Sequence, residues 1–355
     1  MSHAADLPLP PDLVRRYNTW AAGRDWLAAL PRLASECLAR WQLDLDLPPG
    51  ALPWNGHGAI VVPVRGDGHG GKGAAVLKIA YPHDEARVER HALALWGGNG
   101  AARLLAADAV AGALLLERLD AGRSLQDIPL DAAASIWGAL VRRLSLVPDS
   151  RPEWHEFGHI AARAEQWSDE LPETWEQLAR PFPRWLLEAA LEVCQTRGAV
   201  GRRSGRDVLV HTDLHYLNVL ARPETAAPSG ADPAGTAAAG VEEFAAIDPQ
   251  PMTGEAEFAV APLLWNRMAE LSRADPQKAL LERCRDFSEA AGLDPETARQ
   301  WALAREVDNA LWYAARGHHE GDLARSLWVA SALAGRTLPD LPAPHELPAP
   351  GMPAR

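Results

Sequence analysis

The chain has 355 residues, a net charge of −12 at pH 7 and 47% hydrophobic residues. This length and apolar fraction are enough for two lobes with a sizeable core, which excludes disorder of the whole chain. The acidic balance argues against a nucleic-acid-binding surface, and because neither a membrane-length apolar run nor a leader pattern occurs, we expect a cytoplasmic protein without membrane or nucleic-acid partners.

The first 119 residues have the pattern of a small antiparallel sheet with helices. Apolar positions at helical spacing predict a lead helix over residues 24–40. Segments 58–66 and 73–81 are strand-like and flank the glycine-rich turn GDGHGGKG, which is typical of a hairpin. An amphipathic helix follows over residues 84–97, with Asp84 expected as its N-cap. Further strands are predicted over 41–47, 103–108 and 112–119.

From residue 120 the pattern becomes mainly helical. Helices are predicted over 131–145, 159–180, 183–198, 256–273, 276–291 and 295–335. The short strand-like segments DVLVHTD, NVLA and FAAID interrupt them. Residues 223–242 are rich in Pro, Ala and Gly, and we expect an inserted loop there. The predicted parts are 1–119, 120–337 and a proline-rich extended tail over 338–355.

A cluster of polar side chains lies between two strand-like segments, in the stretch HTDLHYLN of residues 211–218. The stretch follows the order H-x-D-L-x-x-x-N, with Asn218 five positions after Asp213. In phosphoryl transfer such an aspartate accepts the hydroxyl proton, while the asparagine binds magnesium. Asp248 ends an apolar strand 30 residues after Asn218, where a second magnesium-binding aspartate belongs. The pattern therefore predicts a loop for phosphoryl transfer.

Lys78 in the strand segment AVLKIA is a candidate to bind the α- and β-phosphates of ATP. Glu85 and Glu89 lie on the following predicted helix, and either is placed to pair with it. We prefer Glu89, because it lies one turn further in, ahead of the apolar face. Alone, such a lysine is as often an edge-strand residue that reaches solvent. Lysine, helix glutamate, H-x-D-x-x-x-x-N loop and later aspartate nevertheless occur in the order that this chemistry requires.

The chain resembles the aminoglycoside phosphotransferase family of the protein-kinase-like fold, and within it the streptomycin 6-kinase and hydroxyurea phosphotransferase branch. The resemblance spans residues 58 to about 270 and is carried by AVLKIA, ALALWGGNGAARLLAAD, GALLLERL, VHTDLHYLNVLA and AIDPQPMTGEAEFAVAPLLWNR. The last segment is the most specific, because IDP-x-P followed by LLWNR is typical of this branch and not of protein kinases. The resemblance implies a bilobal α+β fold with a small antiparallel-sheet N-lobe and a mainly helical C-lobe.

The resemblance also implies ATP-dependent phosphorylation of a small-molecule hydroxyl, with magnesium. Asp213 would deprotonate the acceptor, while Asn218 and Asp248 would bind the metal. Lys78 would contact the ATP phosphates while held by Glu89, with Glu85 as the second choice. The hinge, whose backbone meets the adenine edge, would be Leu116, Glu117, Arg118 and Leu119. His211 would brace the catalytic loop and not act as a base.

The chain departs from the family pattern at several positions. Thr212 stands where the family commonly has glycine, and Pro249 and Gln250 replace the phenylalanine and glycine of a DFG motif. An aspartate often found before the PLLWNR segment is missing, since the chain reads Phe258-Ala259-Val260. The G-x-G-x-x-G loop of kinases is absent as well.

Other interpretations stay open at this point. His211, Asp213 and His215 also form an H-x-D-x-H pattern, half of a metal-hydrolase site whose other ligands are missing. A catalytically silent nucleotide-binding protein is a further alternative. The argument against it is that all four expected polar residues are present, namely Lys78, Asp213, Asn218 and Asp248.

The acceptor is expected to be an aminoglycoside such as streptomycin, with hydroxyurea or a sugar as alternatives. A streptomycin-like cation fits the acidic net charge of the chain, because a guanidinium group on the acceptor would prefer paired carboxylates. The candidate carboxylates are Glu255, Glu257, Glu306 and Asp308. For Glu306 and Asp308, solvated helix charges are the commoner interpretation.

Overall fold

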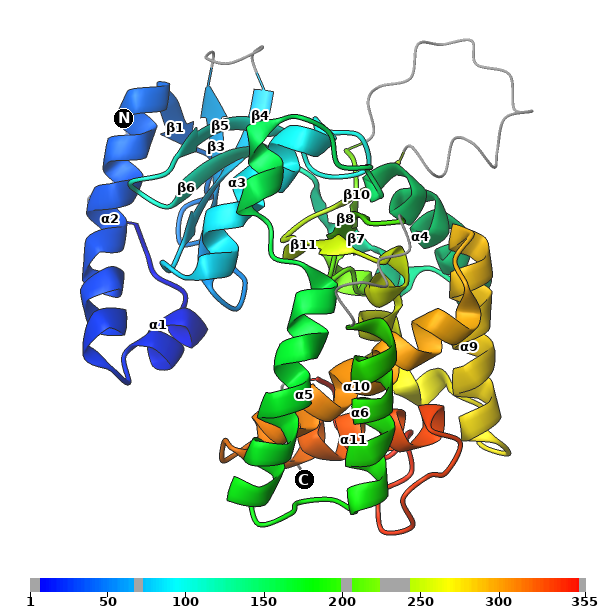
Figure 1. The fold of residues 1–355 in the computed structure, drawn as a ribbon. Helices are drawn as coiled ribbons and strands as arrows, with labels where there is room; N and C mark the ends of the chain where they lie inside the picture. Colours follow the sequence, from blue (N-terminus) through cyan, green and yellow to red (C-terminus); the bar gives the residue numbers. More distant parts are fainter. Residues whose placement is uncertain (1–6, 67–72, 199–205, 224–242, 351–355) are drawn as a thin grey trace. The chain divides into compact units, whose positions relative to one another are not determined.

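A computed structural model of the chain describes residues 7–66, 73–198, 206–223 and 243–350, except the side chains of residues 84 and 85 (Figure 1). The chain divides into two compact units, Met1–Ala121 with Ala221–Asp232, and Gly122–Leu220 with Pro233–Arg355.

The first unit is built on an antiparallel sheet in the order β1-β3-β4-β6-β5, with β2 pairing with β3. Its described elements are α1 (Pro11–Tyr17), α2 (Ala21–Trp41), β1 (Leu43–Leu45), β2 (Trp54–Asn55), β3 (Ala59–Gly66), β4 (Gly73–Ala80), α3 (Asp84–Trp96), β5 (Leu104–Asp108) and β6 (Ala113–Glu117). The predicted hairpin is present, because β3 and β4 pair from Ala59↔Ala80 to Gly66↔Gly73. Its turn, residues 67–72, lies outside the described residues.

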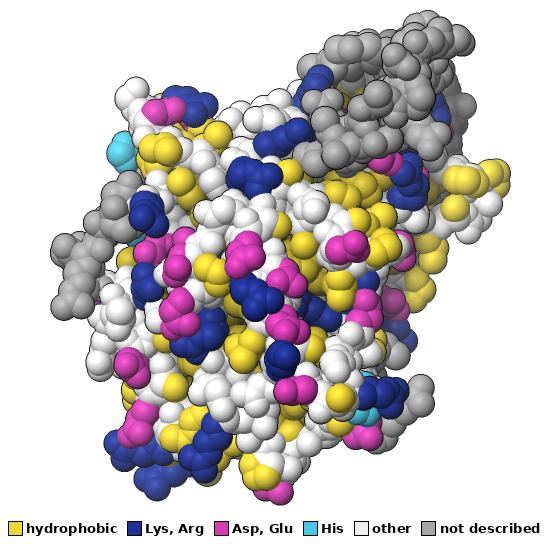
Figure 2. All heavy atoms as spheres, turned by 90° about the vertical axis from the view of Figure 1, so that its right-hand side faces the viewer, with side chains coloured by type: hydrophobic (Ala, Val, Ile, Leu, Met, Phe, Trp, Pro, Cys, Tyr) yellow, Lys and Arg dark blue, Asp and Glu magenta, His cyan; other side chains and the backbone are white. Residues whose placement is uncertain are grey.

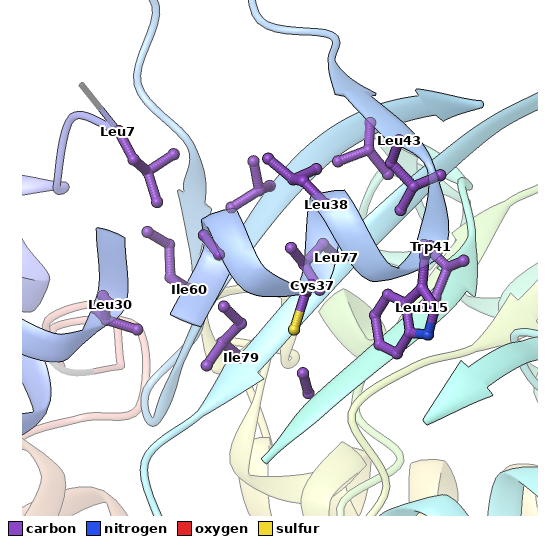
Figure 3. Close-up of a cluster of buried hydrophobic side chains, with 14 of the residues drawn as sticks. Leu7, Leu30, Cys37, Leu38, Trp41, Leu43, Ile60, Leu77, Ile79 and Leu115 are labelled. Carbon is purple, nitrogen blue, oxygen red and sulfur yellow. The ribbon is translucent and has the colours of Figure 1, made fainter. Parts of the chain in front are cut away.

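Helix α2 covers one face of this sheet and forms its core. Cys37 and Leu38 of α2 pack in one buried cluster with Leu77 and Ile79 of β4 (Figure 3). Successive side chains of a strand point to opposite faces, so Lys78 lies on the face opposite to this cluster. The strand therefore buries Leu77 and Ile79 against α2 and presents Lys78 on the other face.

The elements after residue 119 are mainly helical, with short strands between them. They are β7 (Asp120–Ser124), η2 (Leu125–Asp127), α4 (Leu130–Leu144), η3 (Pro152–Glu156), α5 (Ile160–Gln177), α6 (Arg184–Arg197), β8 (Val208–His211), η5 (Tyr216–Asn218), β9 (Val219–Ala221), β10 (Phe244–Ala246), β11 (Pro251–Gly254), η6 (Ala256–Val260), α8 (Ala261–Trp265), η7 (Met268–Glu270), α9 (Pro276–Ala291), α10 (Pro295–Ala314) and α11 (Glu320–Leu333). Strand β8 pairs with β11, and β9 lies between β10 and β7.

Helix α10 lies among helices of the second unit and packs against α5, α6, α9 and α11. Helices α4 and α9 approach each other closely at Gly138. A Cβ at this position would lie 2.4 Å from the backbone carbonyl of Ala290, so only glycine fits without a shift. Trp137 and Phe287 fill the same interface with rings 5.7 Å apart. This packing fixes the helices beside the strand-to-loop segments that carry the predicted catalytic residues.

Two predicted helices are wrong in extent. The helix predicted over 256–273 is replaced by η6, α8 and η7, and the chain breaks between α8 and η7, where Arg267 adopts a left-handed conformation with φ 52°. Arg283 of α9 donates to the carbonyls of Asn266 and Arg267, so a distant arginine replaces the hydrogen bonds that a continuous helix would supply. The helix predicted over 295–335 ends at Ala314 and resumes at Glu320, with His318 at φ 69° between the two pieces.

The predicted N-cap of α3 is also wrong. Asp84 is the first helical residue, and the extended His83 is the N-cap, whose Nδ1 accepts a hydrogen bond from the amide of Ala86 at 3.3 Å. A neutral imidazole has an acceptor nitrogen, so it can take the place of the usual oxygen. Helix α1 and strands β2, β7 and β11 were not predicted.

Two predicted segments lie partly outside the described residues. Of the loop predicted over 223–242, only residue 223 is described. Of the predicted tail, residues 338–350 are described as turns and irregular segments, and Arg325 of α11 donates to the carbonyl of Pro348. The described part of the tail is therefore anchored to the second unit.

Charged side chains of both signs are interspersed over the described part of the face drawn in Figure 2. Exposed pairs four residues apart, such as Lys278–Glu282 on α9, are of the kind that contributes little stability. Among the described residues, no helix combines the length and the apolar content that a membrane span requires.

Candidate active site

Lys78 and Glu89 form a buried ion pair in the first unit. The Nζ of Lys78 lies 2.7 Å from both carboxylate oxygens of Glu89, and the two side chains are only 8% and 4% exposed. Lys78 comes from the middle of β4, and Glu89 from the second turn of α3. The predicted pairing with Glu89 is present, while the side chain of Glu85 lies outside the described residues.

A cavity of about 320 Å³ lies against this ion pair within the first unit. Its walls include Trp26 of α2, Tyr81 and the turn between β5 and β6, and both Lys78 and Glu89 reach its surface. The predicted hinge residues do not belong to its described lining. The ion pair is thus reachable from a side that the hinge does not form.

The predicted hinge begins at the end of β6. Leu116 and Leu119 are buried, whereas the carboxylate of Glu117 accepts hydrogen bonds from the amide of Arg103 at 2.8 Å and from Arg222 at 2.5 Å. The side chain of Glu117 is therefore occupied by structural contacts. Any role of this residue toward a nucleotide falls to its backbone, as the resemblance implied.

His211 of β8 holds the catalytic loop through both of its ring nitrogens. Its Nδ1 accepts from the amide of Asp213 at 3.2 Å, and its Nε2 lies 3.0 Å from the carbonyl of Ile247, to which it donates. Burial lowers the pKa of His211 to about 4, despite the opposing effects of the Ile247 carbonyl and the nearby aspartates. A neutral imidazole with both nitrogens engaged is a brace, which is the role that the resemblance implied.

Asn218 joins the loop to the segment that carries Asp248. Its Nδ2 donates to the carbonyl of Asp213 at 2.9 Å and lies 3.4 Å from the carboxylate oxygen Oδ2 of the same residue. Its backbone carbonyl accepts from the amide of Ile247 at 2.9 Å, directly before Asp248. Because Nδ2 is used in this way, the amide oxygen of Asn218 is the atom left to act as a metal ligand.

Asp248 is exposed and adopts a left-handed conformation with φ 53°. A non-glycine residue there costs free energy and is often found at functional sites. The chain after it is tied back to the catalytic loop, since Thr212 donates to the carbonyl of Gln250 through its hydroxyl at 2.6 Å and its amide at 3.2 Å. Thr212, a departure from the family pattern, therefore links the two loops.

Arg305 of α10 also contacts the catalytic loop, which the sequence did not indicate. Its guanidinium donates to the carbonyl of Thr212, and Nη2 lies 3.7 Å from Oδ1 of Asp213. The available sequence signal was one arginine between the buried residues Ala304 and Glu306 of a helix. Nothing in the local pattern relates that arginine to a loop some 90 residues earlier.

The four acids expected near the acceptor are mostly engaged in the fold. The carboxylate of Glu255 accepts a hydrogen bond from the indole N–H of Trp301 at 2.8 Å and lies 3.4 Å from Arg197. The carboxylate of Glu257 accepts a hydrogen bond from the amide of Asp294.

Glu306 is 1% exposed, and burial raises its pKa to about 7. Asp308, which is 30% exposed and lies 3.7 Å from Arg163, is more accessible than Glu306.

The metal-hydrolase alternative has no support in the described residues. No group of three or more His, Cys, Asp or Glu side chains there is arranged to hold a metal ion. His211 uses both nitrogens for backbone contacts, and Nδ1 of His215 accepts from the amide of Leu217 at 3.2 Å.

Residues 40–317 match the family model described as aminoglycoside/hydroxyurea antibiotic resistance kinase. The chain is 35% identical over 317 residues to a streptomycin 6-kinase of Streptomyces glaucescens, covering 88% of this chain and 92% of that protein. It is 34% identical over 347 residues to a hydroxyurea phosphotransferase of Kitasatospora aureofaciens, covering 94% and 87%.

Among solved structures, the chain is similar to a thermostable mutant of an aminoglycoside phosphotransferase in a ternary complex with ADP and hygromycin B. The TM-score is 0.51 at 14% sequence identity, covering 84% of this chain and 96% of that chain, which establishes the protein-kinase-like fold. With more than half of its length matched by the family model, the chain belongs to the family of aminoglycoside/hydroxyurea antibiotic resistance kinases.

Proposed function

We propose that this protein is an ATP-dependent kinase that transfers the γ-phosphoryl group to a hydroxyl of an aminoglycoside such as streptomycin. The observation that carries the proposal is the loop of residues 211–218, in which Asn218 binds Asp213 and, through its backbone, the chain next to Asp248. Catalysis of phosphoryl transfer is mainly positioning and charge neutralisation, and this loop holds the required groups in a fixed order.

The first unit supplies the nucleotide-binding residues of this proposal. Lys78, held by Glu89, would contact the ATP phosphates, and the backbone of residues 116–119 would bind the adenine edge. The buried ion pair supports this role, because the carboxylate fixes the ammonium group at one point. In the proposed division, residues 1–119 bind the nucleotide, 120–337 carry catalysis and the acceptor site, and 338–355 are the tail.

Asn218 and Asp248 would hold magnesium. Their donor atoms fit the ion, which takes oxygen ligands and is commonly bound by one or two protein groups together with substrate phosphates. When bound, the ion would neutralise charge on the ATP phosphates. The backbone hydrogen bond between Ile247 and Asn218 keeps Asp248, the next residue, near Asn218. Two ligands of one ion must lie close together in this way.

Asp213 would act as the general base. Its carboxylate would accept the proton of the acceptor hydroxyl while that oxygen bonds to the γ-phosphorus and the bond to the ADP oxygen breaks. Its side chain is 26% exposed, so an acceptor can reach it.

The acceptor proposed first is a streptomycin-like cation. The named relatives include a streptomycin 6-kinase and a hydroxyurea phosphotransferase, and the net charge of −12 favours a cation. Asp308, partly exposed on α10, is the acid we place nearest to the acceptor. Hydroxyurea, or a sugar or other small metabolite, is the alternative acceptor.

The test is phosphate transfer by the purified chain with ATP and magnesium. Streptomycin, hydroxyurea, hygromycin B and simple sugars are offered separately, and the product is identified by mass spectrometry, with Asp213→Asn as the matched control. We expect a phosphorylated streptomycin from the wild-type chain alone. A magnesium-dependent thermal shift with ATP but no product from any acceptor would favour the catalytically silent alternative.

Rising salt provides a second measurement. Attraction between exposed charges is screened over about 8 Å at physiological ionic strength, so the KM for a cationic acceptor should rise with salt while kcat holds. Asp308→Asn should raise KM as well, so a KM that neither salt nor this substitution raises would contradict the cationic acceptor and leave the kinase assignment intact.

A further inference from the structure

Arg305 touches the backbone and the side chain of consecutive residues in the catalytic loop. One arm of its guanidinium donates to the carbonyl of Thr212, and Nη2 lies 3.7 Å from Oδ1 of Asp213. The guanidinium also lies over the ring of Phe258, 5.5 Å from its centroid. The side chain is 16% exposed, so its position is determined by these contacts.

The two oxygens of Asp213 have different neighbours. Oδ2 lies 3.4 Å from Nδ2 of Asn218 and 3.8 Å from Nε2 of His215, whereas Arg305 lies on the side of Oδ1. The last torsion of an aspartate is broad, so the plane of its carboxylate is set by such neighbours and not by the residue itself. An arginine on one oxygen and an amide on the other therefore restrict that plane from both sides.

The ring of Phe258 packs against the guanidinium of Arg305. Its ring packs against Trp301 at 5.4 Å and stacks with Trp167 at 6.2 Å, so it belongs to a fixed aromatic cluster. The planar guanidinium can lie over a ring and direct two N–H groups in a fixed fork, a geometry that an ammonium group reproduces only in part. The contact thus favours an arginine, and the aromatic cluster restricts the movement of its guanidinium.

From this geometry we infer that Arg305 is a positioning residue, which fixes the carboxylate plane of Asp213 toward the acceptor hydroxyl. The inference rests on the proposed function, since it assigns Arg305 a part in the same reaction. Arg305 itself would not contact the nucleotide or the acceptor. Its loss should therefore reduce the rate of transfer and leave the affinity for ATP nearly unchanged.

The experiment compares steady-state kinetics of the wild-type chain, Arg305→Ala, Arg305→Lys and the control Arg299→Ala. Arg299 lies on the same helix and binds Glu296 and the carbonyl of Leu333, away from the catalytic loop. A misplaced catalytic group can cost as much as about 100-fold, so we expect kcat to fall about 10- to 100-fold in Arg305→Ala, with KM for ATP within about twofold. Arg305→Lys should lie between the alanine variant and the wild type, and Arg299→Ala should keep its kcat.

Chemical rescue separates positioning from a general structural effect. Millimolar guanidinium added to Arg305→Ala should restore part of kcat, and it should not raise kcat of the wild type or of Arg299→Ala. If Arg305→Ala does not fold, the reduced kcat of Arg305→Lys at unchanged KM for ATP carries the same test.

Two results would overturn the inference in distinguishable ways. An active wild type whose folded Arg305 variants keep their kcat, or lose it without any rescue, contradicts the role of Arg305 alone. A wild type that transfers phosphate to no acceptor contradicts the proposed function, and the role of Arg305 with it.

Discussion

Lys78 is held by a buried ion pair with Glu89, whereas Asp213 is held by several weaker contacts from separate segments. The pair with Glu89 joins a strand to a helix and is almost closed to solvent. The loop of Asp213 is bonded by His211 and Asn218 and is contacted by Arg305, and the carboxylate itself stays partly exposed. The lysine proposed to bind the nucleotide and the aspartate proposed as the base are thus fixed by different means.

The difference follows from what each group has to do. An ammonium group that binds phosphates needs one fixed location, and a buried carboxylate supplies it at the cost of desolvating two charges. A general base must accept a proton from an acceptor that enters and leaves, so it cannot be buried. Several backbone contacts hold the loop instead, and each of them alone contributes little. The contrast is therefore between a buried ion pair and several weaker contacts, and variants of each region can test it.

The largest effect is expected for Glu89→Ala. Removing the carboxylate takes the ion pair at 2.7 Å away from the buried charge of Lys78, and breaking a buried pair in this way costs about 3–5 kcal/mol. Urea unfolding should show this loss. The control is Glu282→Ala, which breaks the exposed pair with Lys278 and should cost less than about 1 kcal/mol.

A double variant sharpens this test. Lys78→Met combined with Glu89→Leu should recover most of the stability, because two apolar side chains replace two desolvated charges. It should not recover phosphate transfer. If Glu89→Ala and Glu282→Ala lose the same free energy of unfolding, the buried pair of Lys78 and Glu89 contributes no more to stability than an exposed pair.

Asp213→Asn should change turnover and not stability. The amide keeps the shape of the side chain and the contacts of the loop backbone, but it cannot accept the proton, so kcat should fall about 100-fold or more. Thermal unfolding should stay within a few degrees of the wild type, and ATP binding measured by calorimetry should be nearly intact. Near-normal turnover in this variant would show that Asp213 is not the general base.

The same contrast explains how much could be predicted from the sequence. Lys78 and Glu89 lie on a strand and a helix whose apolar periodicity is visible, and their pairing was predicted correctly. The spacing of Asp213 and Asn218 is local, so it too was visible. Both signals lie within short windows of sequence, where strand and helix periods determine which residues share a face.

The contacts that hold the catalytic loop could not be predicted, because they come from distant segments. Arg305 and the Gln250 carbonyl reach Thr212 from about 90 and 40 residues away. The break at Arg267 depends on an arginine of α9 that takes up the backbone carbonyls. Glu257 was expected near the acceptor, but it accepts from a backbone amide at the start of α10. Such long-range hydrogen bonds leave no periodic pattern.

Glu306 gives a third case, a buried acid that has no ion pair among the described residues. Burial raises its pKa from 4.5 to about 7, although Ser326, Arg305 and Asn309 oppose the shift. Between about pH 4.5 and 7, Glu306 therefore stays protonated in the native state but has lost its proton in the unfolded state. Its contribution to the free energy of unfolding falls as the pH rises through this range. The slope is at most about 1.4 kcal/mol per pH unit for one proton.

Glu306→Gln isolates this contribution. Relative to the wild type, the variant should gain stability in urea unfolding as the pH rises from 5 to 8. His211 has the opposite effect at lower pH, because its lowered pKa of about 4 makes stability rise with pH up to about 6.5. Since both proteins contain His211, the difference between their curves reports Glu306. A difference that does not change with pH would mean that Glu306 titrates normally.

The smallest effect is expected for Thr212→Val. The variant keeps the shape of the side chain and removes the hydroxyl that donates to the Gln250 carbonyl at 2.6 Å. That carbonyl still accepts from the Thr212 amide, so no buried group is left without a partner, and the cost should be about 1 kcal/mol. We expect kcat to fall a few-fold at most, and Thr212→Ser, which keeps the hydroxyl, to match the wild type. If Thr212→Val instead lost as much stability as Glu89→Ala, one bond would hold the catalytic loop, and the contrast between the two regions would fail.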